Sequence, residues 1–428
     1  MRDKMECIRN IAKKLADYNE MLPILQDPYN CQNFKEKKLP VYDENSLSHG
    51  LPAVCMLFAE LSELYPNEDW DMMAHQYLYK IQKGIEENKV ADLSMFSGYA
   101  GIGLAVECLS KKGTRYQRLK KFINGYMQDT FPGFMDTLSK SDFCFMRDYD
   151  VISGLSGILG YTIWQEELRE VNKRIGEYLV KRCQYIQYGQ HVLPGFYIPQ
   201  KYQFLEEDRE HFPQGNFNLG FSHGVPGILT ALCILYKNNI DVNGIEEAIE
   251  ICSEMIVKFE DRGKKRWGAY VSLEEYLRGS VENVQTRDAW CYGSPGVCYA
   301  LYIGGVTLGN EKYKCRALEV MRDIAGSLAG VYSPTFCHGY AGVAYIYWRF
   351  YEMIKSQEWK NYSTQLMEKA WEFYDEKNPF GFQDVELDSR TNQIGLLSGV
   401  SGVLLPLLAA ETKKKTRWDC AFLLGDFN

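Results

Sequence analysis

The stretch VISGLSGILGY, residues 151–161, places two glycines at Gly-x-x-Gly spacing ahead of an apolar run. Glycine permits positive φ and lets neighbouring backbones approach closely. The apolar run after Gly157 suits a helix that is buried on most of its faces. We therefore expect a tight turn at Gly154, where glycine would permit positive φ and close packing, that leads into a buried helix.

The same pattern occurs seven times, with first glycines 46 to 70 residues apart. Between the copies, apolar residues recur every three or four positions, which is typical of amphipathic helices. Each repeat thus predicts one buried inner helix and one amphipathic outer helix. The copies are LSHGLPAVCML (47–57, with Ala53 for the second glycine), MFSGYAGIGLA (95–105), VISGLSGILGY, GFSHGVPGILT (220–230), AWCYGSPGVCY (289–299), TFCHGYAGVAY (335–345) and GLLSGVSGVLL (395–405).

No single hairpin can bury its inner helix alone, so the repeats favour an all-α fold in which seven hairpins close into an α/α toroid. An open solenoid is the alternative, but solenoids have more regular spacing and polar capping repeats. We expect one seven-repeat α/α-barrel domain over residues 1–428. Prolines, glycines and aromatic residues in the two longest intervals predict loops or a small strand-bearing insertion, around 185–216 in the first of them.

The composition limits the partners and the compartment. A net charge of -8 provides no basic surface, so we expect no nucleic-acid partner. The most apolar segment, 395–410, contains two serines and a proline and is short for a membrane span. The charged start of the chain predicts an amphipathic helix rather than a signal peptide. We therefore expect a cytoplasmic protein whose thirteen cysteines are mostly free thiols.

Two cysteines and a histidine occupy equivalent motif positions. Cys291 and Cys337 each stand two residues before the first glycine of their repeat, and His338 follows Cys337. If the repeats are structurally equivalent, these side chains face one cavity. Two thiolates and an imidazole with an open fourth position form a known catalytic zinc site. The pattern predicts one Zn²⁺ per chain; the alternative is two packed cysteines and a histidine that binds a turn.

Other polar residues next to the motifs could transfer protons. His223 precedes Gly224, and imidazole titrates near neutral pH. His49 has the same local sequence in the first repeat, and the pattern does not distinguish a catalytic histidine from one that caps a turn. Asp150 could orient a histidine or act as a base, or it could be a helix N-cap, and Asp148 competes for these roles.

Arg287 is a candidate for stabilising an oxyanion. The alternative for Arg287 is an ordinary ion pair with Asp288 or another carboxylate.

In combination, DVISGLSGILGY, SHGVPGI, RDAWCYGSPGV and CHGYAGVAY resemble the LanC family of lanthipeptide synthetase cyclases, and the resemblance extends over essentially the whole chain. It implies a seven-hairpin α/α barrel and addition of a substrate-peptide cysteine to dehydroalanine or dehydrobutyrine. It also implies a dehydrated precursor peptide with a leader as substrate, and a lanthipeptide dehydratase and a membrane transporter complex as partners. The residues that match the family's zinc ligands are Cys291, Cys337 and His338, and those that match its catalytic residues are His223, Asp150, Arg287 and Tyr292.

The chemistry of the residues agrees with this reaction. A free thiol with a pKa of about 8.5 is mostly protonated at neutral pH, and zinc would convert it to a thiolate. Attack on the β-carbon creates an enolate that needs stabilisation and a proton. We expect His223, oriented by Asp150, to donate that proton, with Arg287 and Tyr292 at the enolate; the converse role of His223 as a base stays open.

Other functions stay open at this point. A LanC-like enzyme could add glutathione or another thiol to a dehydro residue, and a prenyltransferase would need clustered basic residues that the glycine loops lack. A glycosidase would need paired carboxylates, for which Asp148 and Asp150 are the candidates. A non-catalytic toroidal scaffold would close its zinc site with a fourth protein ligand, and no further cysteine or histidine adjoins the two motifs in an obvious position.

Overall fold

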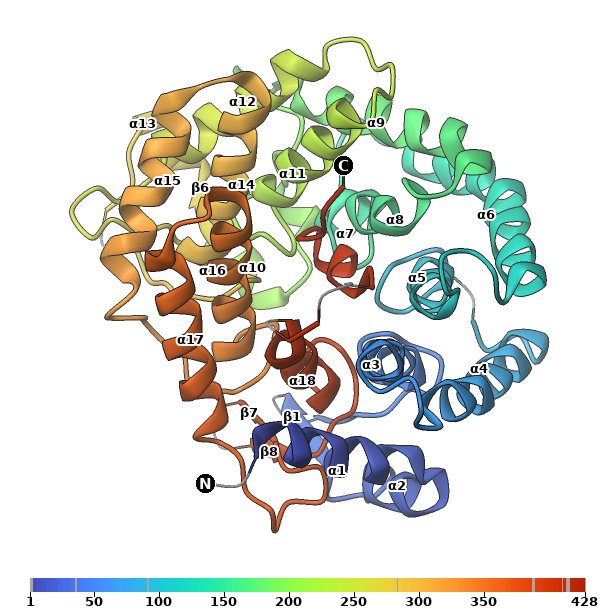
Figure 1. The fold of residues 1–428 in the computed structure, drawn as a ribbon. Helices are drawn as coiled ribbons and strands as arrows, with labels where there is room; N and C mark the ends of the chain where they lie inside the picture. Colours follow the sequence, from blue (N-terminus) through green and yellow to red (C-terminus); the bar gives the residue numbers. More distant parts are fainter. Residues whose placement is uncertain are drawn as a thin grey trace. The chain divides into compact units, whose positions relative to one another are not determined.

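The computed structural model describes residues 3–34, 37–90, 92–282, 284–386, 389–409, 411–412 and 416–427. These residues are mostly helical and form four short two-stranded antiparallel sheets (Figure 1). Contacts along the chain define two compact units. Unit 1 comprises Met1–Asp92, Phe96–Lys121 and Val331–Trp418, and unit 2 comprises Leu93–Met95, Phe122–Gly330 and Asp419–Asn428.

Each glycine motif leads into a helix, as predicted. These inner helices are almost entirely buried; in α11, for example, every residue from 225 to 235 is buried. Burial of an aliphatic side chain contributes about 1.5–3 kcal/mol, so the inner helices supply much of the core. The inner helices are α3 (Leu51–Leu64), α5 (Tyr99–Leu109), α8 (Leu155–Thr162), α11 (Val225–Lys237), α14 (Ser294–Leu308), α16 (Tyr340–Ile354) and α18 (Val400–Ala409).

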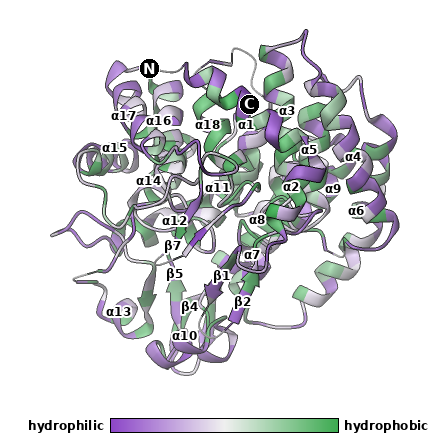
Figure 2. Cartoon of the chain, turned by 90° about the horizontal axis from the view of Figure 1, so that it is seen from below, coloured by the Kyte–Doolittle hydropathy of each residue, from purple (hydrophilic) through white to green (hydrophobic). Residues whose placement is uncertain are grey.

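The outer helices bury one face each. In α12 the buried residues include Ala248, Ile249, Cys252 and Ile256, which recur at helical spacing. Figure 2 shows α18 largely in the hydrophobic colour and much of α6 in the hydrophilic colour. The outer helices are α4 (Trp70–Glu86), α6 (Gln117–Leu138), α9 (Arg169–Cys183), α12 (Ile245–Lys258), α15 (Glu311–Ile324) and α17 (Gln357–Trp371).

Inner and outer helices pack as hairpins within each unit. In unit 1, α3 packs on α4 and α16 on α17; in unit 2, α8 packs on α9, α11 on α12 and α14 on α15 (Figure 1). The last repeat differs, because α18 is followed by a 3-10 helix, η3 (Trp418–Phe422). With no outer α-helix after it in the described residues, α18 packs on α3, so the last repeat is a neighbour of the first within unit 1. The described part of the chain contains no helix that is both long and apolar enough to cross a membrane.

The start of the chain is helical and amphipathic, as expected, but it is divided in two. Helix α1 (Lys4–Ala16) buries Ile8, Ala12 and Leu15 and contacts α3. Asp17 ends α1 and accepts hydrogen bonds from the backbone of α2 (Tyr18–Leu25), which starts the second helix.

The remaining elements are short. The long interval that predicted strands contains the hairpin of β3 and β4, and its β5 pairs with β6 from the other long interval. The strands are β1 (Cys31–Phe34), β2 (Lys37–Pro40), β3 (Tyr185–Tyr188), β4 (His191–Pro194), β5 (Asn216–Asn218), β6 (Tyr270–Ser272), β7 (Asp384–Glu386) and β8 (Ser389–Thr391). The short helices are α7 (Met146–Tyr149), η1 (Glu166–Leu168), η2 (Gln200–Tyr202), α10 (Glu206–His211) and α13 (Leu273–Arg278).

The second glycine of the motif provides space for a backbone contact. A Cβ at this glycine in five repeats would lie 1.9 to 2.6 Å from the carbonyl oxygen six residues earlier. At Gly342, the closest case, that oxygen belongs to Phe336. The loop thus folds back onto the first turn of its own helix, and a larger side chain would separate them. The five glycines are Gly157, Gly227, Gly296, Gly342 and Gly402.

Most of the first glycines do not use the positive φ that glycine permits. Gly293 has φ 87°, but Gly154 has φ -102° and Gly224 has φ -135°. Steric room explains glycine at the negative-φ positions, because a Cβ on Gly224 would lie 2.2 Å from the carbonyl oxygen of Asn218.

Backbone hydrogen bonds join the motif loops of neighbouring repeats. In unit 2, Val151 N donates to Ser222 O at 2.9 Å, and Ser222 N donates to Cys291 O at 3.2 Å. In unit 1, Cys337 N donates to Leu397 O at 2.9 Å. These residues stand two or three positions before the first glycines of their repeats. Positions that correspond in sequence therefore lie side by side within each unit.

Candidate active site

His223 and Asp150 lie at the entrances of two inner helices in unit 2. His223 directly precedes Gly224 at the start of α11, and Asp150 lies in the turn before α8. Nδ1 of His223 is 2.5 Å from Oδ2 of Asp150. The Asp150 side chain is 1% exposed, whereas the His223 side chain is 27% exposed. One ring nitrogen of His223 is therefore held by a buried carboxylate, which leaves Nε2 for proton transfer.

Asp150 also has the capping role that was the alternative to orienting a histidine. Its Oδ1 accepts hydrogen bonds from the backbone N–H of Ser153 at 2.7 Å and of Gly154 at 2.8 Å. Asp148 has a different partner, because its Oδ2 accepts from Phe145 N at 2.9 Å. Asp150 is thus the carboxylate that contacts His223, and the turn that it caps fixes its direction.

The surroundings of His223 favour its protonated form. Burial alone would lower the pKa of His223, but the charge of Asp150 and the hydrogen bond to it outweigh burial, and the charge of Cys291 acts in the same direction. The pKa of His223 is therefore raised above its ordinary value of 6.5. A raised pKa increases the protonated fraction of His223 at a given pH, which suits a proton donor.

His49 has the same local sequence, but its pKa is shifted in the opposite direction from that of His223. Burial lowers the pKa of His49, and its Nδ1 is buried without a hydrogen-bond partner among the described residues. In the neighbouring repeat, Gly395 holds the motif position that corresponds to Asp150. A Cβ at Gly395 would lie 1.7 Å from the carbonyl oxygen of Ser48, so no carboxylate fits there. The structure thus distinguishes His223 from His49, which the sequence pattern leaves equivalent.

Tyr292 lies next to His223 in unit 2. The two ring centroids are 6.1 Å apart. The Tyr292 hydroxyl accepts a hydrogen bond from Nδ2 of Asn218 at 3.2 Å. Burial, with a smaller effect from Tyr270, raises the pKa of Tyr292 well above its ordinary value, so its hydroxyl keeps its proton at neutral pH. Tyr292 can therefore donate a hydrogen bond to an oxyanion nearby.

Asn218 and Gly220 are site residues that the sequence analysis missed. Asn218, the last residue of β5, is fully buried, and its Oδ1 accepts from Gly220 N at 2.8 Å. A Cβ on Gly220 would lie 2.4 Å from Cε1 of Tyr292, so this glycine makes room for the ring. Nothing in the local sequence distinguishes Asn218 from an ordinary turn asparagine.

Arg287 stands on the same loop as Cys291 and Tyr292. Its Nε donates to the carbonyl oxygen of Gly330 at 3.2 Å. Asp288, the alternative partner of Arg287, has its Oδ2 3.1 Å from Nε of Arg266 and accepts from Ala329 N. Asp288 is therefore already engaged by another arginine.

The candidate metal ligands belong to both units. Cys291 is a buried residue of unit 2, next to the His223 loop through its hydrogen bond from Ser222. Cys337 and His338 belong to unit 1, in the loop before α16. Nε2 of His338 lies 3.0 Å from Oδ1 of Asp384. The described residues contain no group of three or more His, Cys, Asp or Glu side chains arranged to hold a metal, and the three-ligand site stays a prediction.

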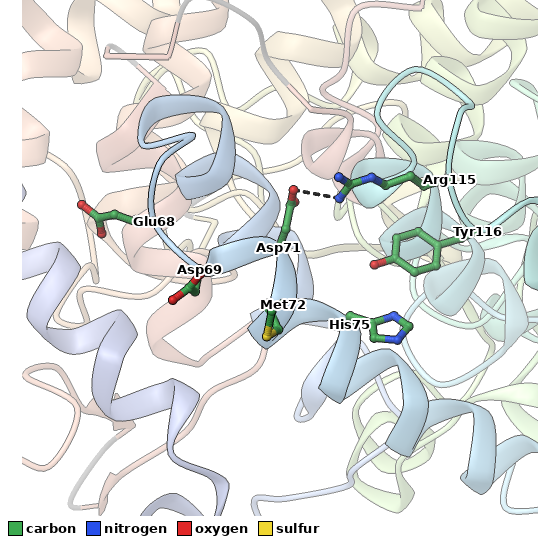
Figure 3. A pocket seen from close by; sticks show the side chains of 7 residues that line it. All are labelled: Glu68, Asp69, Asp71, Met72, His75, Arg115 and Tyr116. Atoms are coloured by element: carbon green, nitrogen blue, oxygen red, sulfur yellow. Dashed lines mark hydrogen bonds and ion pairs between the residues drawn. The ribbon is translucent and has the colours of Figure 1, made fainter.

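A surface pocket in unit 1 lies apart from the glycine motifs (Figure 3). It has a volume of about 510 Å³ and contains an ion pair between Arg115 and Asp71 at 2.8 Å. None of the predicted site residues lines it. The lining residues are Glu68, Asp69, Asp71, Met72, His75, Arg115 and Tyr116.

Comparisons with known proteins agree along the whole chain. The sequence profile described as "Lanthionine synthetase C-like protein" matches residues 42–423. The nisin biosynthesis protein NisC of Lactococcus lactis subsp. lactis is 26% identical over 443 residues, which cover 100% of this chain and 97% of that protein. A solved structure of nisin cyclase superposes with a TM-score of 0.81 at 25% identity and covers 97% of each chain.

The all-α fold class predicted from the repeats is therefore confirmed, both by the helices of the chain and by the match to nisin cyclase. Because the family profile spans nearly all of the sequence, the chain belongs to the lanthionine synthetase C-like protein family.

Proposed function

We propose that this chain is a zinc-dependent lanthipeptide cyclase. It would add cysteine thiols of a precursor peptide across the double bonds of dehydroalanine or dehydrobutyrine, forming lanthionine or methyllanthionine rings. The observation that carries the proposal is the His223–Asp150 pair on the loop beside Cys291, in a chain that aligns along its length with a nisin cyclase. In this addition, sulfur bonds to the β-carbon and a proton reaches the α-carbon, so the product is an isomer of the substrate.

Cys291, Cys337 and His338 would hold one Zn²⁺. Their donor set suits this metal, since two thiolates and one imidazole leave a fourth position for a substrate. The hydrogen bond from Nε2 of His338 to Asp384 also fits, because it selects the tautomer whose Nδ1 carries the lone pair that a metal needs. When bound, zinc would lower the pKa of the substrate thiol so that it reacts as a thiolate.

His223 would supply the proton that completes the addition. Its Nδ1 is held by Asp150, and its pKa is raised by the charge of Asp150 and the hydrogen bond to it, which favours the protonated ring. Nε2–H of His223 would then donate to the α-carbon of the enolate. The proton of the substrate thiol would go to solvent. His223 Nε2 would take a proton back from solvent, which restores the enzyme for the next addition.

Tyr292 and Arg287 would stabilise the enolate oxygen. Tyr292 keeps its hydroxyl proton and lies beside His223. Arg287 lies four residues before Cys291 on the same loop, and a guanidinium group offers several N–H donors to an oxyanion. Hydrogen-bond donors aimed at a developing negative charge typically lower a barrier by about 2.7–4 kcal/mol each.

The substrate would be a dehydrated precursor peptide with a leader. A net charge of -8 suits a neutral or cationic peptide. A lanthipeptide dehydratase would have to supply the dehydro residues, and a membrane transporter complex would accept the finished peptide. We propose a cytoplasmic enzyme that reaches the membrane through these partners.

The test is ring formation by the purified full chain. The substrate is a synthetic leader peptide that carries one dehydroalanine and one cysteine, and alkylation followed by mass spectrometry counts its free thiols. We expect loss of the thiol at unchanged peptide mass, and little loss with His223→Ala. In a parallel reaction with added glutathione, a glutathione adduct in place of the ring would favour the other thiol-addition enzyme. An unreacted peptide with zinc-loaded protein would favour a non-catalytic scaffold.

A further inference from the structure

Asp384 is a buried carboxylate at the start of β7, in unit 1, and it is neither one of the three proposed zinc ligands nor one of the proposed catalytic residues. Its side chain is 1% exposed, and β7 pairs with β8 in a hairpin that follows α17. Burying a carboxylate is costly unless several hydrogen bonds satisfy its oxygens. The hydrogen-bond partners of Asp384 therefore indicate the role of its carboxylate.

Both oxygens of Asp384 accept hydrogen bonds from side chains. Oδ1 accepts from Oγ of Ser333 at 2.9 Å and lies 3.0 Å from Nε2 of His338. Oδ2 accepts from Nε2 of Gln32 at 3.3 Å and of Gln393 at 3.4 Å. Uncharged groups from three separate segments thus fix the carboxylate, with one oxygen directed at the imidazole.

We propose that Asp384 is the positioning residue of His338: it takes the Nε2–H, fixes the tautomer and ring orientation, and presents Nδ1 for a zinc ion. This inference rests on the proposed function, because it needs His338 to be a metal ligand. A carboxylate that accepts the second N–H of a ligating histidine raises the basicity of that ligand, and its loss typically weakens metal binding by about 10- to 100-fold.

Glu386 offers a matched control, because it contacts the same nitrogen in a different environment. Its Oε2 is 3.2 Å from Nε2 of His338, but its side chain is 36% exposed. Exposed charges are screened by water and contribute little. Asp384→Asn should therefore weaken zinc binding by about 10- to 100-fold, whereas Glu386→Gln should change it less than about threefold.

The experiment measures the zinc dissociation constant of the full chain by chelator competition, for the wild type, Asp384→Asn and Glu386→Gln. The absorption bands of the Co²⁺-substituted proteins report ligand geometry. We expect Asp384→Asn to shift these bands, whereas a purely structural role for Asp384 would leave them unchanged. An equal or tighter zinc constant for Asp384→Asn would overturn the inference. Wild-type protein without zinc affinity would instead contradict the proposed metal site itself, so the two failures are distinguishable.

Ser333→Ala provides a second variant in case Asp384→Asn does not fold. Ser333 donates to the same oxygen that faces His338, and its removal keeps the carboxylate while loosening its position. We expect zinc binding several-fold weaker than wild type, in the same direction as Asp384→Asn. Zinc binding equal to wild type in Ser333→Ala, with Co²⁺ bands also unchanged, would count against positioning through Asp384.

Discussion

Asp150 holds Nδ1 of His223 at 2.5 Å with one carboxylate oxygen and caps the turn into α8 with the other. The same carboxylate thus sets the backbone geometry of its own repeat and the charge of a histidine in the next repeat. This arrangement explains how two motif loops with ordinary turn residues produce one histidine with a raised pKa.

Asp150→Asn should lower the turnover rate and shift its pH dependence. Asparagine can still cap the turn, but without the negative charge, burial lowers the pKa of His223. As a proton donor, His223 is active below its pKa, so activity falls as the pH rises through that value. The fall should therefore begin at lower pH in Asp150→Asn, which a pH–rate profile of ring formation measures. Asp148→Asn should keep the wild-type profile, and an unshifted profile for Asp150→Asn would rule out this role.

His223→Ala should reduce the rate of ring formation by about 100- to 10,000-fold, the usual contribution of general acid–base catalysis. His49→Ala should have little effect on the rate, because His49 has no carboxylate partner at the position of Asp150. Comparable losses for both variants would show that the two histidines act together.

His49 should make the protein less stable in acid. Its pKa in the folded chain is lowered by burial below 6.5, so the unfolded chain binds a proton more readily. Its contribution to stability is present above pH 6.5 and is lost as the pH falls toward the lower folded pKa. Asp43 and Asp384 oppose the shift without reversing it. His49→Gln should reduce the loss of urea resistance on acidification, and a parallel loss in both proteins would contradict this assignment.

Gly220→Ala should lower the turnover rate by about 100-fold while the fold persists. The new methyl group would lie 2.4 Å from the ring of Tyr292, which must move. A displacement of about 1 Å at a catalytic group can reduce the rate by about 100-fold. Kinetics and circular dichroism together check this outcome. Gly326→Ala is the control, because a Cβ there meets nothing within 4 Å, and it should behave as wild type.

Gly342→Ala should destabilise unit 1 by about 1–3 kcal/mol, because its Cβ would lie 1.9 Å from the carbonyl oxygen of Phe336 in the loop before α16. The urea midpoint of unfolding measures the change. An unchanged midpoint would mean that this loop moves away from its helix at little cost.

The purified protein should contain about one zinc per chain by plasma mass spectrometry, and Cys337→Ala should lose it. Cys315 provides the control, since it is an exposed cysteine in α15, and Cys315→Ala should keep its zinc. Zinc-free wild type, purified without chelators, would contradict the proposed mechanism.

The sequence by itself determined the seven inner helices and the alternation of inner and outer elements. The reason is local: a glycine pair, an apolar run and an amphipathic segment depend on helical spacing and backbone room within one repeat. The same repeats made His223 and Asp150 candidates for one site, because equivalent positions of adjacent repeats come together once the loops pair, but they did not separate them from His49 and Asp148. Tyr292 was selected only by the resemblance to the LanC family.

Only the tertiary structure decided which of two similar histidines has a charged partner. The difference between His223 and His49 depends on Asp150 in one neighbouring repeat and Gly395 in another, a contact between segments far apart in the chain. Asn218 and Asp384 were likewise identified only from contacts between segments far apart in the chain. Each is an ordinary polar residue in the sequence, and its role comes from burial against a site residue that local patterns do not encode.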